Sequence, residues 1–255
     1  MAYLRLLVVG LGLQVKMLSR SSFNGILGIL YPLFFATVAF FMYQAGAKTS
    51  LPYAGLGAAV MGIWSSTSTS AGSAMQRERW HGTLELLVAA PSPFSLVMLP
   101  MTIAMSAIGL YSMAATLLWG RVLFGIHVHV ADWLPFCLGV VVTVISIGMC
   151  GFLMAVAFVR YRAAWALGNL FEYPVWLICG FLVTIDHFPG WVQAIAKGLA
   201  PYWGMNAVRN AANGIPAYQD IGWCALLGLT YLVLGIAVSD VMLRAARRRA
   251  TLALT

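Results

Sequence analysis

The residues with the greatest chemical potential lie inside apolar stretches of the chain. Glu172 stands alone among apolar residues and is followed directly by Tyr173 and Pro174. A carboxylate at mid-membrane depth costs about 2.5 kcal/mol or more, so this side chain should face protein or water rather than lipid. Two interpretations stay open. Glu172, with Asn169 one turn earlier, could supply polar contacts along a path through the membrane or at a dimer seam. Alternatively, Glu172 could bond the backbone group that Pro174 leaves free.

A run of six hydroxyl residues occupies positions 65–70. Serine and threonine hydroxyls can bond carbonyls of their own helix, so the run needs no ligand. Small residues also allow neighbouring helices to approach closely. Packing is therefore one interpretation. The other is that Ser66, Thr69 and Ser70 line a polar path.

No set of residues resembles a catalytic or metal site. His127 and His129 lie near Asp132 in a segment that is typical of a solvated loop. The four cysteines all lie in apolar stretches, as small buried side chains do. No GxxxxGK[ST] phosphate loop occurs anywhere. We expect a protein that is not an enzyme, holds no metal or cofactor of its own, and binds no nucleic acid.

The elements that must position these residues are membrane helices. Hydrophobic residues make up 62% of the 255 residues and charged residues only 9%, against roughly 25% charged in soluble domains. A spanning helix needs ~20 mostly apolar residues. Six stretches qualify and predict an all-α integral membrane domain covering residues 1–255: 23–43, 53–74, 96–118, 133–159, 164–185 and 221–241.

Two further segments are apolar but are not predicted to span the membrane. Residues 3–20 place Arg5, Lys16 and Arg20 on one narrow helical arc, which predicts an amphipathic helix in the membrane interface. Residues 187–213 are interrupted by Pro189, Pro201 and three glycines, and each half is too short to cross. A re-entrant or surface helical hairpin on the outer side, before the sixth span, fits better.

The basic residues predict the orientation. With a cytoplasmic N-terminus, eleven of the 15 Lys and Arg residues fall on the cytoplasmic side and four fall outside, so the positive-inside rule puts both termini in the cytoplasm. The cytoplasmic set is Arg5, Lys16, Arg20, Arg77, Arg79, Arg160, Arg162, Arg244, Arg247, Arg248 and Arg249, and the outer set is Lys48, Arg121, Lys197 and Arg209.

The cytoplasmic loop at residues 75–91 carries both charge signs. A loop that served only to set the membrane topology would need basic residues alone, whereas mixed charges on a short helix suit docking onto another protein. A solvated connector is the alternative. The residues of interest are Arg77, Glu78, Arg79, Gly82, Thr83, Leu84 and Glu85.

The string RERWHGTLELLVAAP in this loop resembles the RE-x-GTLE-x-L-x-x-x-P signature of type-two ABC exporter permeases. A second stretch, ICGFLVTIDHFPGWVQAIAKGLAPYWGMNAVRNA, resembles the end of that family's fifth span and the hairpin that follows. Its matching positions are Phe188, Pro189, Trp191, Leu199, Pro201 and Arg209. Trp80 and His81 depart from the family pattern, which commonly has a charged residue before the glycine.

The resemblance implies that the segment from Arg77 to Leu87 is a coupling helix that docks onto a separate ATPase subunit, which binds ATP and Mg. It implies a homodimer or a heterodimer with a paralogous permease, two ATPase copies, and a place in the inner membrane. The expected function is export of an amphipathic or lipid-linked substrate, such as a drug or antibiotic. A membrane-embedded enzyme and a non-transporting membrane scaffold are the alternatives.

Overall fold

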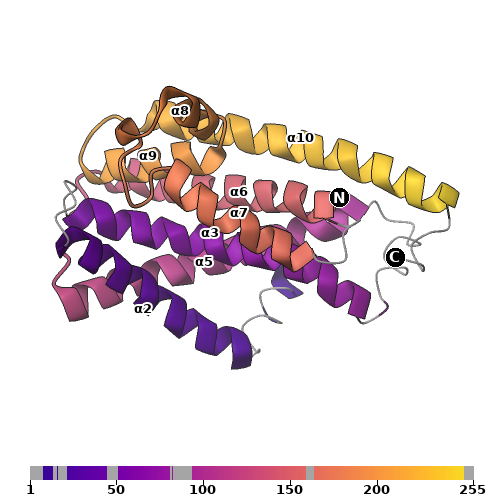
Figure 1. The fold of residues 1–255 in the computed structure, drawn as a ribbon, viewed down its shortest axis with the longest axis horizontal. Coiled ribbons are helices and arrows are strands. Elements are labelled where there is room, and N and C mark those ends of the chain that lie inside the picture. The colour runs from indigo at the N-terminus through magenta and orange to yellow at the C-terminus, as the bar shows by residue number, and fades with distance from the viewer. Residues whose placement is uncertain are drawn as a thin grey trace.

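The computed structural model describes residues 8–13, 16, 22–44, 51–80, 82, 94–158 and 164–249. Within these ranges every regular element is helical, which confirms the predicted all-α class for the described part (Figure 1). The elements are α2 (Ser22–Gln44), α3 (Leu51–Trp80), α5 (Phe94–Phe124), α6 (Trp133–Phe158), α7 (Ala164–Ile178), the 3-10 turn η1 (Ile185–His187), α8 (Gly190–Lys197), α9 (Ala200–Ala212) and α10 (Tyr218–Arg249).

Three described helices are both long enough and apolar enough to cross a membrane. They are Ser95–Phe124 in α5, Trp133–Phe158 in α6 and Tyr218–Val241 in α10. They correspond to the third, fourth and sixth predicted spans. Helix α3 has 30 residues, but its hydroxyl run lowers its mean hydropathy, and α7 has only 15 residues. Six spans therefore stay a prediction.

One predicted span boundary is wrong, and one helix continues past the end of its predicted span. The fifth predicted span extends to residue 185, yet α7 ends at Ile178 because Gly180 takes a left-handed conformation with φ of 72°. The second predicted span ends at residue 74, yet α3 continues to Trp80. Charged residues mark the end of an apolar stretch, but they are good helix formers and do not end a helix.

The two segments that did not read as spans are partly described. Residues 8–13 of the N-terminal segment are helical, and Gly10 lies against Pro100 of α5; the other residues of 3–20, except Lys16, lie outside the described part. The predicted hairpin contains two short helices, α8 and α9, separated by Gly198 and Leu199. The proline at position 201 occupies the first turn of α9, where a missing N–H costs nothing.

Helix α3 is the axis of the bundle. It packs against α2, α5, α6, α7 and α9, while α10 lies along α6 and α9 on the far side (Figure 1). The close approach depends on small residues. A side chain at Gly109 of α5 would lie 2.6 Å from the Cα atom of Ile63, and one at Gly62 would meet the Ser112 hydroxyl. The helices can therefore pack backbone to backbone, as they do in membrane bundles.

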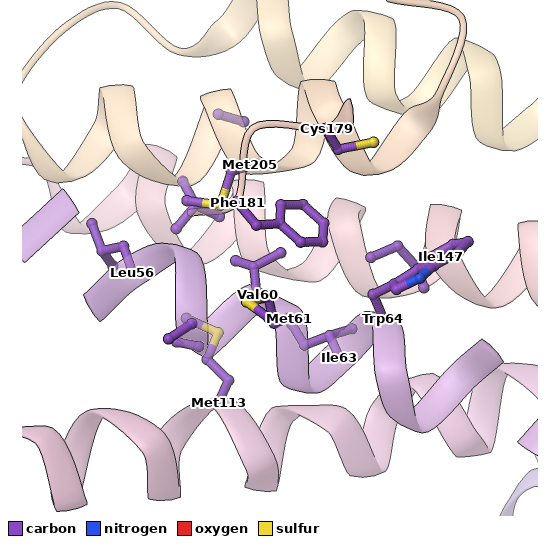
Figure 2. Packing of buried hydrophobic residues seen from close by; sticks show 14 of the residues in the cluster. Leu56, Val60, Met61, Ile63, Trp64, Met113, Ile147, Cys179, Phe181 and Met205 are labelled. Carbon is purple, nitrogen blue, oxygen red and sulfur yellow. The ribbon is translucent and has the colours of Figure 1, made fainter. Parts of the chain in front are cut away.

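The main hydrophobic cluster lies where α3 meets α7 and α9. Figure 2 shows Phe181, from the segment after α7, above Val60 of α3 and beside Met205 of α9. All three side chains are fully buried. The unwound segment after α7 is thus part of the core rather than a surface loop.

Candidate functional site

The first part of the site is the end of α7. The N–H of Gly180 bonds the carbonyl of Leu177 (3.3 Å), and the N–H of Phe181 bonds that of Trp176 (3.3 Å). With Gly180 in the left-handed conformation, these two bonds form a Schellman motif. The helix ends inside the core without leaving all its last carbonyls unpaired.

Arg209 of α9 binds the segment that follows this helix end. Its Nη1 donates to the carbonyl of Gly180 (2.7 Å), and its Nη2 donates to that of Phe181 (2.6 Å). The guanidinium Cζ lies 3.3 Å from the centre of the Tyr53 ring of α3. The side chain is only 5% exposed. Backbone carbonyl oxygens and the face of an aromatic ring both carry partial negative charge, so they compensate the buried cation in place of a carboxylate.

Gly57 of α3 makes this arrangement possible. Any side chain at this position would overlap the carbonyl oxygen of Phe181 and would lie 2.7 Å from Nη2 of Arg209. Three elements therefore meet over one glycine: the axis helix α3, the unwound segment after α7, and α9. We call Arg209, Tyr53, Gly57, Gly180 and Phe181 the arginine junction.

Glu172 lies two turns before the end of α7 and faces α3. It is 6% exposed. The Ser65 hydroxyl of α3 approaches the carboxyl group, although its oxygen makes no hydrogen bond of ordinary geometry with the described residues. The Tyr31 hydroxyl of α2 lies within electrostatic reach of the same group. Glu172 is thus shielded from the surroundings of the bundle, and no cation from the described residues pairs with it.

The hydroxyl run encircles α3 and contacts different helices. Ser68 donates to the carbonyl of Gly168 on α7 (2.7 Å), and Ser66 donates to that of Met105 on α5 (3.4 Å). Thr67 and Thr69 bond carbonyls of their own helix, at Ile63 (2.9 Å) and Ser65 (2.6 Å). These bonds are those that the packing interpretation predicts. Of the predicted lining residues, Ser66 points from α3 toward α5, whereas Glu172 points from α7 toward α3.

The structure says less about two other predicted lining residues. Asn169 lies partly buried on α7, one turn before Glu172. The side chain of Ser70 lies outside the described part.

The predicted docking loop is described only at its start. Arg77, Glu78 and Arg79 belong to the last turns of α3, and their side chains lie outside the described part. Gly82 is exposed and has a φ of 67°, so the chain turns there. Thr83, Leu84 and Glu85 also lie outside the described part. In the described backbone, α3 continues to Trp80 and the chain turns at Gly82. This is the region in which the docking helix is predicted to begin.

Several side chains tie the hairpin to α10, and Tyr231 lies at the break within it. The Tyr231 hydroxyl donates to the carbonyl of Gly198 (3.1 Å) and accepts from the N–H of Ala200 (3.2 Å), so it bridges the break between α8 and α9. At the start of the hairpin, the Gln193 amide donates to the carbonyl of Phe188 (3.0 Å). Pro189 precedes α8, and Trp191 is exposed. Of the predicted hairpin residues, Arg209 therefore lies in the core, while Trp191 lies on the surface.

The sequence alone did not single out Tyr53, Gly57 or Tyr31. Tyr53 and Tyr31 look like ordinary aromatics of a membrane helix, and Gly57 is one of 25 glycines. The one readable signal was the small-residue turn at Cys179 and Gly180, because glycine after an apolar helix is a common helix terminator.

Closely packed apolar helices with buried charges and an interrupted helix define a multi-pass membrane protein. A family model described as ABC-2 type transporter matches residues 7–212. The match spans most of the chain and includes the arginine junction and Glu172, and the chain belongs to the ABC-2 type transporter family. It is a transporter permease. A search of curated proteins found no match.

Proposed function

We propose that this chain is the membrane-spanning subunit of an ATP-driven exporter. The observation that carries the proposal is the family membership, which covers residues 7–212. The chain has no phosphate loop of its own, so ATP and Mg belong to a separate ABC ATPase present in two copies. Two permeases, identical or paralogous, enclose the path for an amphipathic or lipid-linked substrate of the drug or antibiotic type.

The distribution of basic residues supports an orientation with both termini in the cytoplasm. The last turns of α3 and α10, which contain Arg77, Arg79 and Arg244, lie toward the same end of the bundle (Figure 1). Arg121 ends α5 and Lys197 ends α8 toward the opposite end. By the positive-inside rule the arginine-rich end is cytoplasmic, in a plasma or inner membrane crossed by six spans. The hairpin of α8 and α9 then lies on the outer side.

Helix α3 supplies a mechanical link between the two ends. It runs without interruption for 30 residues, which is on the order of 45 Å at ~1.5 Å per residue. Tyr53 and Gly57 of the arginine junction stand near one end, and Arg77 to Arg79 stand at the other. Movement of the docking loop by the ATPase would therefore displace the part of α3 against which Arg209 and the segment after α7 pack. ATP binding and hydrolysis would favour different positions of this unit, as alternating access requires.

Charge reversal in the docking loop tests the proposal. The chain is tagged, purified from its own membranes, and assayed for the ATPase that copurifies and for substrate-stimulated ATP hydrolysis in reconstituted vesicles. Glu78→Lys with Glu85→Lys should abolish copurification, because like charges at a desolvated contact cost about 2–5 kcal/mol. Asp132→Lys is the matched control, since Asp132 is exposed between α5 and α6 at the opposite end of the bundle.

The outcomes separate the alternatives. If the double reversal copurifies with the ATPase and stimulates hydrolysis as the native chain does, the loop is a solvated connector and the docking assignment is wrong. If the native chain recruits no ATPase at all, a scaffold or a membrane-embedded enzyme replaces the exporter proposal.

A further inference from the structure

Within the described part of the chain, the buried Glu172 carboxyl lacks a charged partner, and two buried donors near it lack acceptors. Among the described residues, no Lys, Arg or His forms an ion pair with its carboxyl, and the Ser65 hydroxyl approaches it without ordinary hydrogen-bond geometry. The Ser65 hydroxyl, on a side chain only 2% exposed, also lacks a partner in the described part of the chain. So does the indole Nε1 of Trp176, one turn further along α7. Buried polar groups are nearly always paired, so two unpaired donors beside a buried carboxyl that has no cationic partner call for an explanation.

Aromatic rings surround this carboxyl. Trp176 packs edge-to-face on Phe35 of α2, with ring centroids 5.7 Å apart, and on Tyr173, with centroids 5.0 Å apart. Phe35 in turn stacks on Tyr31. The faces of such rings attract cations, most strongly where water is excluded. The combination of one anionic group with several aromatic rings is suited to an organic cation, whereas a neutral or anionic ligand would gain nothing from the carboxylate.

The rings also provide the route to the carboxyl. Helices α2 and α7 both pack on α3, and Tyr31 on α2 is 40% exposed while Tyr173 on α7 is 59% exposed. Glu172 thus lies one layer beneath an exposed aromatic rim.

We propose that Glu172, Ser65, Tyr31 and Trp176 form a binding site, the carboxylate site, for the positively charged group of an amphipathic organic cation. Glu172 supplies the counter-charge, the rings of Tyr31 and Trp176 enclose the cation, and Ser65 donates to the carboxylate. This inference rests on the proposed transport function and names the substrate class. It places recognition between α2, α3 and α7, at a distance from the arginine junction.

Equilibrium binding tests the carboxylate site without the ATPase. The probe is radiolabelled tetraphenylphosphonium, a permanent lipophilic cation, added to the purified full-length chain in micelles of a neutral detergent. The native chain should bind it saturably. Unlabelled methyltriphenylphosphonium should compete, and triphenylphosphine oxide should not, because it has the same three phenyl rings but no net charge.

Three variants localise the binding. Glu172→Gln keeps the size and removes the charge, and it should weaken binding about 10- to 100-fold. Asp132→Asn removes one exposed carboxylate elsewhere and should change the dissociation constant less than about twofold. Tyr173→Leu removes an exposed rim ring without opening the core and should weaken binding about threefold or more.

The binding constants test the proposal even if one variant fails to fold. If triphenylphosphine oxide competes as well as the phosphonium, or if folded Glu172→Gln binds with the native constant, the carboxylate site does not recognise cations. If Glu172→Gln does not fold, the competition pair and Tyr173→Leu still distinguish a cation site from general hydrophobic binding. Failure here leaves the copurification result intact, and a failed copurification leaves these binding constants intact, so the two proposals fail separately.

Discussion

The seam between α3 and the segment from α7 to α9 contains two buried charges that are treated in opposite ways. Arg209 donates two short hydrogen bonds, stacks on Tyr53, and joins three elements. Glu172 is also buried, yet no cation of the described residues pairs with it, and the Ser65 hydroxyl approaches it without ordinary hydrogen-bond geometry. Of the Arg209 guanidinium nitrogens, only Nε lacks a hydrogen-bond partner among the described residues, so this buried charge is largely compensated and stabilises the fold. A buried charge that is not compensated costs stability, and a ligand of opposite charge can supply the missing compensation.

Removal of Arg209 should have the largest effect. Arg209→Leu leaves the Phe181 carbonyl without its donor and the Gly180 carbonyl with only the long bond from the Tyr53 hydroxyl (3.5 Å). It should lower the free energy of unfolding by about 3–5 kcal/mol. The measurement is the thermal midpoint of detergent-purified protein by fluorescence-detected size exclusion. Lys197→Leu removes an exposed cation from α8 and should leave the midpoint nearly unchanged. Equal midpoints for the two variants would contradict the assigned role of the arginine junction.

A side chain at Gly57 should come next. Gly57→Val puts atoms where the Phe181 carbonyl lies, so the segment after α7 must move at a cost of about 1–3 kcal/mol. Gly222→Val is the control, because nothing lies within 4 Å of the position where its first side-chain carbon would be. Limited proteolysis near Gly180 should become faster for Gly57→Val only. Unchanged cleavage would show that the segment does not depend on Gly57.

The hydroxyl run should give a smaller effect. Ser68→Ala removes the interhelical donor to the Gly168 carbonyl, which lies within α7 and keeps the bond of its own helix, and should cost about 0.5–1.5 kcal/mol. Thr230→Ala removes an exposed hydroxyl that bonds only its own helix, at Leu227, and should cost less than about 0.5 kcal/mol. The comparison of both thermal midpoints checks this. If Ser68→Ala melts as the native chain does, packing does not explain the run.

Glu172 should give the smallest effect and the opposite sign. Glu172→Leu removes an uncompensated buried carboxyl and should leave stability unchanged or raise it by up to about 1 kcal/mol. A loss as large as that of Arg209→Leu would mean that Glu172 is structural after all, and it would remove the contrast between the two charges. The same thermal assay serves as the measurement.

The sequence predicted the helices well where apolar length alone defines them. Residues 23–43 and 133–159 were expected, and α2 and α6 agree within about a residue at each end. The fifth span was predicted too long because residues 179–185 are as apolar as the helix before them. Hydropathy reports burial, and the segment after α7 is buried in protein without being helical. Only the left-handed glycine distinguishes the two cases.

The site was harder to predict because its contacts are long-range. The Arg209 side chain bonds carbonyls 28 and 29 positions earlier and stacks on a ring 156 positions earlier. No spacing rule connects such residues. Glu172 could be found from sequence, since a lone carboxyl in an apolar stretch is conspicuous, but its neighbours Ser65 and Tyr31 depend on how α2 and α7 pack on α3.

The shortness of α7 has a consequence for how the chain is made. Its 15 residues extend about 22 Å at ~1.5 Å per residue, less than the ~30 Å hydrocarbon core. As α7 leaves the ribosome it cannot bridge the bilayer alone, and the carbonyl of Phe181 lacks its Arg209 donor until that residue has been synthesised 28 positions later. Insertion of α7 is therefore completed only after translation of α9, and a chain truncated before residue 209 should leave it unassembled and open to membrane quality-control proteases.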